Sequence, residues 1–104
     1  MTNLNLQIRW KNMDKDVLAE EYFYNKITKL LDFNFVNVDE KFKAEITYYA
    51  KSNKYKSSLS FAIKGRPDVH AKSNEYSNLQ HSINELVEKT LDQLRRIKTQ
   101  FKNN

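Results

Sequence analysis

Lysines and arginines are the residues of this 104-residue sequence with the clearest capacity for chemistry, because they bind phosphate groups. Residues 41–72 contain eight basic and two acidic residues, whereas residues 1–40 contain five basic and seven acidic ones. Residues 73–104 contain five basic and four acidic residues, and most of the basic ones come late. Together with a net charge of +5, this distribution favours a polyanionic partner.

Side chains suited to catalysis or metal binding are few. His70 and His81 have no second histidine or carboxylate at the spacing of a metal site. The carboxylate pairs at residues 20–21 and 39–40 are adjacent in sequence, so they point apart on a helix or strand. The absence of cysteine and the single glycine exclude thiol nucleophiles, Cys-ligated metals and Gly-rich phosphate loops. We therefore expect a protein that is not an enzyme and that uses no metal, cofactor or small-molecule substrate.

Alternating hydrophobic and polar residues predict the strands that would position the basic side chains. The first strand covers residues 3–10, and the second begins at Phe42. The third passes through Leu59 to residue 63, after a hairpin turn at residues 52–54. The fourth is short and is centred on Val69 and Ala71, after a turn that contains the only glycine and the only proline.

Hydrophobic residues at helical spacing predict two helices. The first begins after an N-cap at Asp14 and ends near Leu31, with Val17 and Leu18 in its apolar stripe. The second covers about Leu79 to Phe101.

The predicted order β-α-β-β-β-α is typical of a two-layer α+β sandwich in which both helices pack on one face of a four-stranded sheet. Strands one and two would be parallel if they are adjacent, and strands two to four would form an antiparallel meander. The length predicts a single domain over residues 1–104. The other face of the sheet would be exposed to solvent.

Several basic residues are predicted to share this exposed face. They are Arg9, Lys11, Lys43, Lys64, His70 and Lys72, with Lys51, Lys54, Lys56 and Arg66 in turns. Such a surface would bind an RNA backbone with an affinity that falls steeply with salt. Tyr49 projects from the same face, as either a base-stacking residue or a half-exposed strand aromatic. The alternative is that the lysines only prevent edge-to-edge aggregation and that the basic residues late in the second helix only complement its dipole.

One stretch of the sequence carries a family resemblance: Ser77 to Leu86, followed by Lys89, Gln93-Leu94 and Arg96. It resembles one helix of the ribosome hibernation-promoting factor / protein Y family. That helix has the pattern D-M-Y-x-A-I-x-x-L-I-x-K-L-x-R-Q-L-x-K. Within the matched stretch, Asn78-Leu79 stands at D-M and Ser82-Ile83 stands at A-I. The strand around Val69 and the order of elements also match.

The sequence departs from this pattern at three positions. Gln80 replaces the usual Tyr, Thr90 replaces a core Leu, and Asp92 replaces an Arg. The chain ends at Asn104 without an acidic tail or a dimerising domain, so it looks like a short form of the family.

The resemblance implies a cytoplasmic translation regulator that binds the small ribosomal subunit and its rRNA in the channel for mRNA and tRNA. There it would inhibit translation or promote ribosome hibernation under stress, and a partner for ribosome dimerisation is left open. No membrane association is expected, because no apolar run approaches the roughly 20 residues that span a bilayer. Candidate rRNA contacts by this resemblance are Lys26, Lys29, Lys64, Arg66, Lys72, Lys89, Arg95 and Arg96.

Two other functions are open at this point. One is a protein–protein interaction module, such as a small homodimer that pairs exposed sheet edges or faces. The other is a general double-stranded-RNA-binding domain, which has a related α-β-β-β-α order. The additional first strand at residues 3–10 argues against the second of these.

Overall fold

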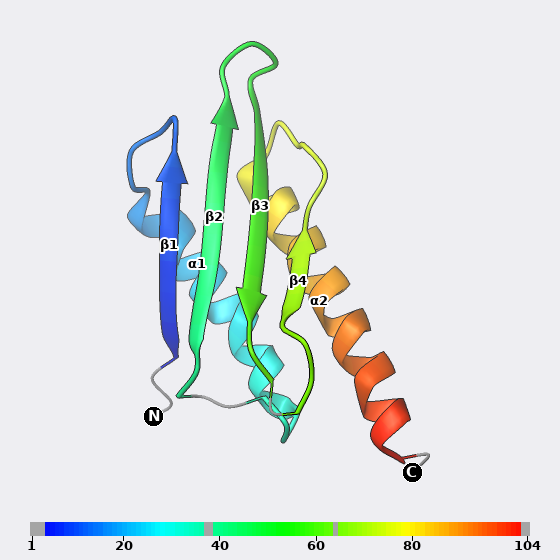
Figure 1. The fold of residues 1–104 in the computed structure, drawn as a ribbon. Helices are drawn as coiled ribbons and strands as arrows, with labels where there is room; N and C mark the ends of the chain where they lie inside the picture. The colour runs from blue at the N-terminus through cyan, green and yellow to red at the C-terminus, as the bar shows by residue number, and fades with distance from the viewer. Residues whose placement is uncertain (1–3, 37–38, 64, 103–104) are drawn as a thin grey trace.

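The computed structural model describes residues 4–36, 39–63 and 65–102, with side chains as far as residue 100. Its elements are β1 (Asn5–Lys11), α1 (Val17–Ile27), the 3-10 helix η1 (Thr28–Asp32), β2 (Lys41–Tyr49), β3 (Lys54–Phe61), β4 (Val69–Lys72) and α2 (Leu79–Lys102). This order confirms the prediction from the sequence (Figure 1). Within the described residues, no helix is long and apolar enough to cross a membrane.

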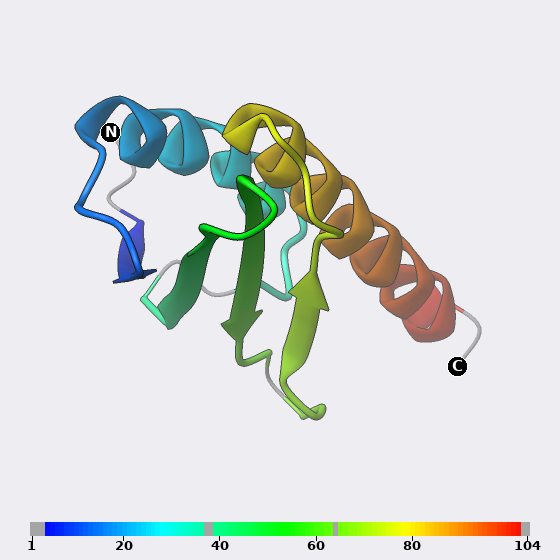
Figure 2. The same cartoon turned by 90° about the horizontal axis from the view of Figure 1, so that it is seen from above.

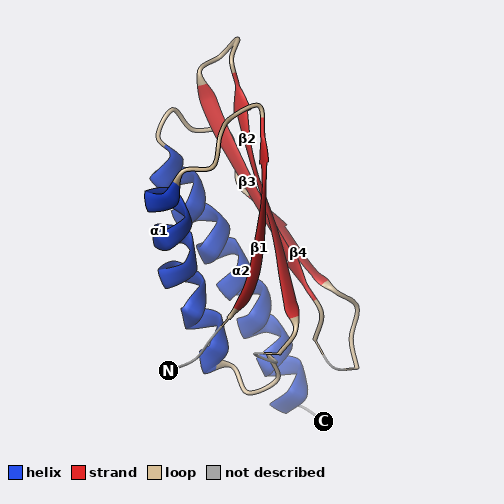
Figure 3. Ribbon diagram, turned by 90° about the vertical axis from the view of Figure 1, so that its left-hand side faces the viewer, coloured by secondary structure: helices blue, strands red, loops and turns tan. Residues whose placement is uncertain are grey.

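The four strands form one sheet in the order β1-β2-β3-β4. β1 and β2 are parallel, whereas β2, β3 and β4 form an antiparallel meander. Both helices lie on the same face of this sheet (Figures 2 and 3). The predicted α+β sandwich is therefore confirmed, and its second sheet face carries no covering layer among the described residues.

The core fills the space between the sheet and the helices. Burial alternates along the strands, so that Phe42 and Phe61 face the helices and pack with ring centroids 4.7 Å apart. Phe23 on α1 and Leu86 on α2 belong to the same hydrophobic cluster, and both are fully buried. This arrangement leaves the alternate residues of every strand on the open face.

The start of α1 differs from the prediction. Asp16, not Asp14, is the N-cap, and its Oδ1 accepts a hydrogen bond from the Ala19 amide at 3.2 Å. Val17 and Leu18 are 60% and 77% exposed, so their predicted burial is wrong. The buried positions of α1 recur every fourth residue from Ala19, which turns the two residues before it away from the core.

A buried cluster of hydroxyl groups joins α2 to the sheet. Ser82 on α2 lies with its Oγ 2.7 Å from the Oγ atoms of both Ser57 on β3 and Ser73 after β4. Thr90 is fully buried and donates its hydroxyl to the Leu86 carbonyl oxygen at 2.8 Å. Each of these polar groups therefore has a partner inside the apolar core.

Candidate nucleic-acid interface

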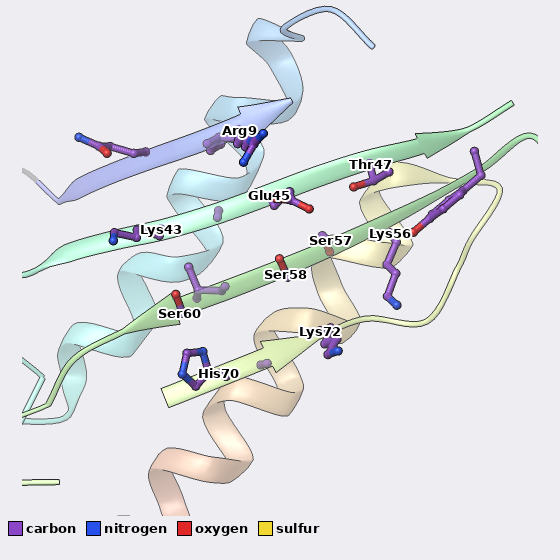
Figure 4. Close-up of a pocket in the computed structure, with 16 residues that line it drawn as sticks. Arg9, Lys43, Glu45, Thr47, Lys56, Ser57, Ser58, Ser60, His70 and Lys72 are labelled. Carbon is purple, nitrogen blue, oxygen red and sulfur yellow. The ribbon is translucent and has the colours of Figure 1, made fainter. Parts of the chain in front are cut away.

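The open face of the sheet consists of rows of side chains that cross the strands (Figure 4). One row contains Arg9, Glu45, Ser58 and Lys72, because these residues are paired in register from β1 to β4. The neighbouring rows are Gln7, Lys43, Ser60 and His70 on one side, and Lys11, Thr47 and Lys56 on the other. A last row pairs Tyr49 with Lys54 near the hairpin.

Positive charge dominates this surface, which we call the open basic face. Its cationic residues are Arg9, Lys11, Lys41, Lys43, Lys54, Lys56 and Lys72, and His70 lies among them. Glu45 is the single carboxylate on the strand positions of this face that the structure describes. The face therefore has the composition of a phosphate-binding surface.

The centre of the open basic face is hollowed. A depression of about 830 Å³ is lined by side chains of all four strands. Half-buried hydroxyl residues Thr47, Ser58 and Ser60 lie along its middle, with cationic residues on both sides (Figure 4). Because serine and threonine are short, a phosphodiester backbone can approach the sheet closely and accept hydrogen bonds from them.

Few of these cations are neutralised within the protein. Glu45 pairs with Lys11, with 3.4 Å between the Nζ and Oε1 atoms. In the part of the chain that the structure describes, Arg9, Lys43 and Lys72 make no salt bridge. Their charges are therefore available to a ligand, and Glu45 is the one carboxylate that a polyanion bound on this face would meet among the described strand residues.

The basic surface continues around the β4 edge onto α2. Lys89 donates from its Nζ to the Lys72 carbonyl oxygen at 3.2 Å and pairs with Glu85 at 3.3 Å. Gln93 donates from its Nε2 to the His70 carbonyl oxygen at 2.8 Å. These side chains cap outward carbonyl groups of β4, which makes this edge a poor template for another strand.

Three more of the predicted contact residues lie near or on α2. Arg66, in the turn before β4, donates from its Nη1 to Gln100 Oε1 at 2.5 Å. Arg96 shares a side of α2 with Gln93, three residues before it, and so faces the β4 edge. Arg95 is exposed and pairs with Asp92 at 2.9 Å, outside this edge.

The other predicted contact residues do not join this surface. Lys26 lies on α1 with its Nζ 5.4 Å from the centroid of the Tyr22 ring, and Lys29 is exposed on η1. Both therefore belong to the helix layer. Lys64 lies outside the described residues.

The structure corrects the placement of two lysines. Lys54 and Lys56 belong to β3 and not to the turn, because the turn covers residues 50–53. Asn53 closes it with a φ of 54°, a left-handed conformation that Asn tolerates better than most residues. Lys41 was not predicted to lie on the open face, although extending the alternation back from Phe42 by one residue would have placed it there.

One ionisable pair stands at the far end of the β4 edge. Glu85 accepts hydrogen bonds from the Tyr76 hydroxyl and from the Asn74 amide, and both lower the pKa of its carboxyl group. The same hydrogen bond to Glu85 raises the pKa of the Tyr76 hydroxyl. Among the described residues, no three acidic, histidine or cysteine side chains gather as a metal site.

Comparison with known proteins gives a family and two structural matches. A family model described as "Sigma 54 modulation protein / S30EA ribosomal protein" matches residues 6–102. A ribosomal subunit interface protein from Coxiella burnetii has a TM-score of 0.73 at 15% identity, over 90% of this chain and 97% of that chain. The N-terminal domain of Protein Y from Thermus thermophilus has a TM-score of 0.68 at 18% identity, over 91% and 98% respectively. No curated protein sequence matches the chain. At these identities, the two structural matches establish the fold alone.

Proposed function

The chain belongs to the Sigma 54 modulation protein / S30EA ribosomal protein family, and we propose that it binds the small ribosomal subunit through its open basic face. In this proposal the protein occupies the channel for mRNA and tRNA, where it inhibits translation or promotes ribosome hibernation under stress. The family match also confirms the resemblance to hibernation-promoting factors seen in the sequence.

The observation that carries the proposal is the uneven charge of the two layers. The open basic face has seven cationic strand residues and the single carboxylate of Glu45 within the described chain. The first helix, in contrast, begins among Asp14, Asp16, Glu20 and Glu21. A protein with this distribution of charge approaches an RNA surface with the sheet toward the phosphates and α1 away from them.

The chemistry of the face favours backbone contacts over reading of a base sequence. Lysines and serine hydroxyls bind phosphate and ribose oxygens, which fix position and orientation without specifying sequence. Specificity for one place on the ribosome would come from the shape of the rRNA, as is general for structured RNA. The candidate contacts Arg66, Lys72, Lys89 and Arg96 extend this surface along one edge of the sheet.

The proposal is tested by sedimentation of the protein with purified small subunits at two salt concentrations. The variant Lys43→Gln/Lys72→Gln removes two cations that have no salt bridge within the described residues. We expect roughly 10-fold weaker binding at low salt and a salt slope lower by about two, since each lost phosphate contact releases about one fewer counterion.

Lys15→Gln/Lys98→Gln is the matched control, because it removes the same charge from exposed residues before α1 and on α2. The control should bind as the unmodified protein does. Equal loss in both variants would show that net charge alone drives binding, and no loss in the first variant would overturn the proposed face. Binding of any RNA duplex as tightly as of small subunits would instead indicate a general double-stranded-RNA-binding domain.

A further inference from the structure

Tyr49, the last residue of β2, is the most exposed of the described aromatic residues. Its side chain is 37% exposed, whereas all other described aromatic side chains are buried or half-buried. It also lines the depression of the open basic face. Neither core packing nor the preference of strands for tyrosine requires an exposed ring within a cationic depression.

The side chain before it shows what a structural tyrosine looks like in this hairpin. Tyr48 faces the helix side, packs on the Tyr55 ring at a centroid distance of 5.1 Å, and donates its hydroxyl to Asn53 Oδ1 at 2.6 Å. Within the described residues, Tyr49 has no ring partner and no cation over its ring, since the cation–π contact there joins Lys26 and Tyr22. Neither face of its ring is therefore occupied by another described aromatic ring or by a cation.

Two lysines lie beside this ring. Lys54 is directly opposite Tyr49 in the β2–β3 register, and Lys56 is its diagonal neighbour, opposite Thr47. Directly opposite residues have Cβ atoms about 5 Å apart and diagonal ones about 7–8 Å, within reach of long side chains. A flat apolar surface and two ammonium groups at this spacing match the two parts of one nucleotide, its base and its phosphate.

We propose that Tyr49 is a stacking platform for one unpaired RNA base, with the phosphate of that nucleotide held by Lys54 or Lys56. The base must be unpaired, because in an A-form helix both faces of each base are covered by its neighbours. This inference rests on the proposed function and adds to it a preference for a single-stranded segment at the hairpin end of the open basic face.

The test uses the full chain and a short unstructured oligoribonucleotide with one central 2-aminopurine, whose fluorescence falls when it stacks. Tyr49→Phe keeps the ring and should bind within about twofold of the unmodified protein with the same quenching. Tyr49→Leu keeps bulk but removes the aromatic face, and it should lose about 5- to 150-fold in affinity. It should also abolish the additional quenching at saturation. Tyr48→Leu is the control on the opposite face, and thermal unfolding of each variant shows that it is folded.

The outcomes separate this inference from the proposed function. In Lys43→Gln/Lys72→Gln, we expect weaker oligonucleotide binding but full quenching once the protein is saturated. If Tyr49→Leu binds and quenches as the unmodified protein does, the stacking platform is wrong while the basic face stands. If the oligonucleotide binds no variant and small subunits do not bind the unmodified protein either, the proposed function fails as well.

Discussion

At the scale of single residues, β3 illustrates how one strand meets opposite demands on its two sides. Leu59 and Phe61 are 2% and 3% exposed and pack under the helices. Ser58 and Ser60, which alternate with them, are half-buried on the open face. Large apolar side chains hold the layers together, while small hydroxyl side chains keep the opposite surface low enough for a ligand backbone to approach.

Replacement of Phe61 by Ala tests this assignment of sides. We expect a loss of about 3–5 kcal/mol in the free energy of unfolding, because a buried aromatic ring is removed beside Phe42. Urea unfolding measures it, with Leu18→Ala as a control on a residue that is 77% exposed and should change stability by less than about 0.5 kcal/mol. A loss below about 1 kcal/mol for Phe61→Ala would place the ring on the open side.

At the scale of elements, the segment between β4 and α2 is held by backbone and side-chain hydrogen bonds. Tyr76 forms an isolated bridge with Tyr55 at the start of β3, and its hydroxyl donates to Glu85 on α2. Asn78 caps α2, with its Oδ1 accepting from the Gln80 amide at 2.8 Å. The connection thereby holds α2 in register with the β4 edge, where Lys89 and Gln93 meet the strand.

The hydrogen bonds of Glu85 make part of this attachment dependent on pH. These hydrogen bonds lower the folded-state pKa of the Glu85 carboxyl group below the usual 4.5. The stability that they contribute is therefore present above pH 4.5 and is lost as the pH falls through the folded-state pKa. Glu85→Gln should therefore be less stable than the unmodified protein near neutral pH, and the difference should shrink toward about pH 3. Urea unfolding at both pH values measures this, with the exposed Glu88→Gln as a control. A difference that does not change with pH would contradict the role given to the Glu85 carboxylate.

Local periodicity accounts for what the sequence predicted well at this scale. Each element has a buried side that can be recognised from the spacing of its own hydrophobic residues. Examples are the alternation around Phe42 and Leu59 and the four-residue spacing from Ile83 to Val87. The errors at this scale concern the start of α1. Asp14 and Asp16 are equally good caps by type, and Val17 and Leu18 fit the apolar repeat although they are exposed.

Contacts between distant segments could not be predicted in the same way. The hydroxyl cluster of Ser57, Ser73 and Ser82 joins residues 25 positions apart, and each serine alone is typical of a surface. The capping of the β4 edge by Lys89 and Gln93 likewise depends on where α2 crosses the sheet. For the candidate interface, the residue pattern placed Lys43, His70 and Lys72 on one sheet face, as the structure does. The family resemblance added Lys26 and Lys29, which lie in the helix layer and away from that face.

At the scale of the whole molecule, the protein is a slab with unlike faces. The helix layer covers one face of the sheet, as Figures 2 and 3 show, and the open basic face is the other. Acidic residues gather at the start of α1, whereas seven cationic residues lie on the open basic face and others lie around the β4 edge. Such a distribution steers a protein toward a polyanion in one orientation and weakens as salt is added.

The most direct test of this account is the chemical reactivity of individual lysines in the bound protein. Acetylation by a water-soluble reagent, read by mass spectrometry, compares each lysine in the free protein and in its complex with small subunits. We expect Lys43, Lys56 and Lys72 to be protected in the complex, while Lys15 and Lys98 react as in the free protein. Protection of Lys26 and Lys29 on the helix layer, with the lysines of the open basic face still reactive, would contradict the account.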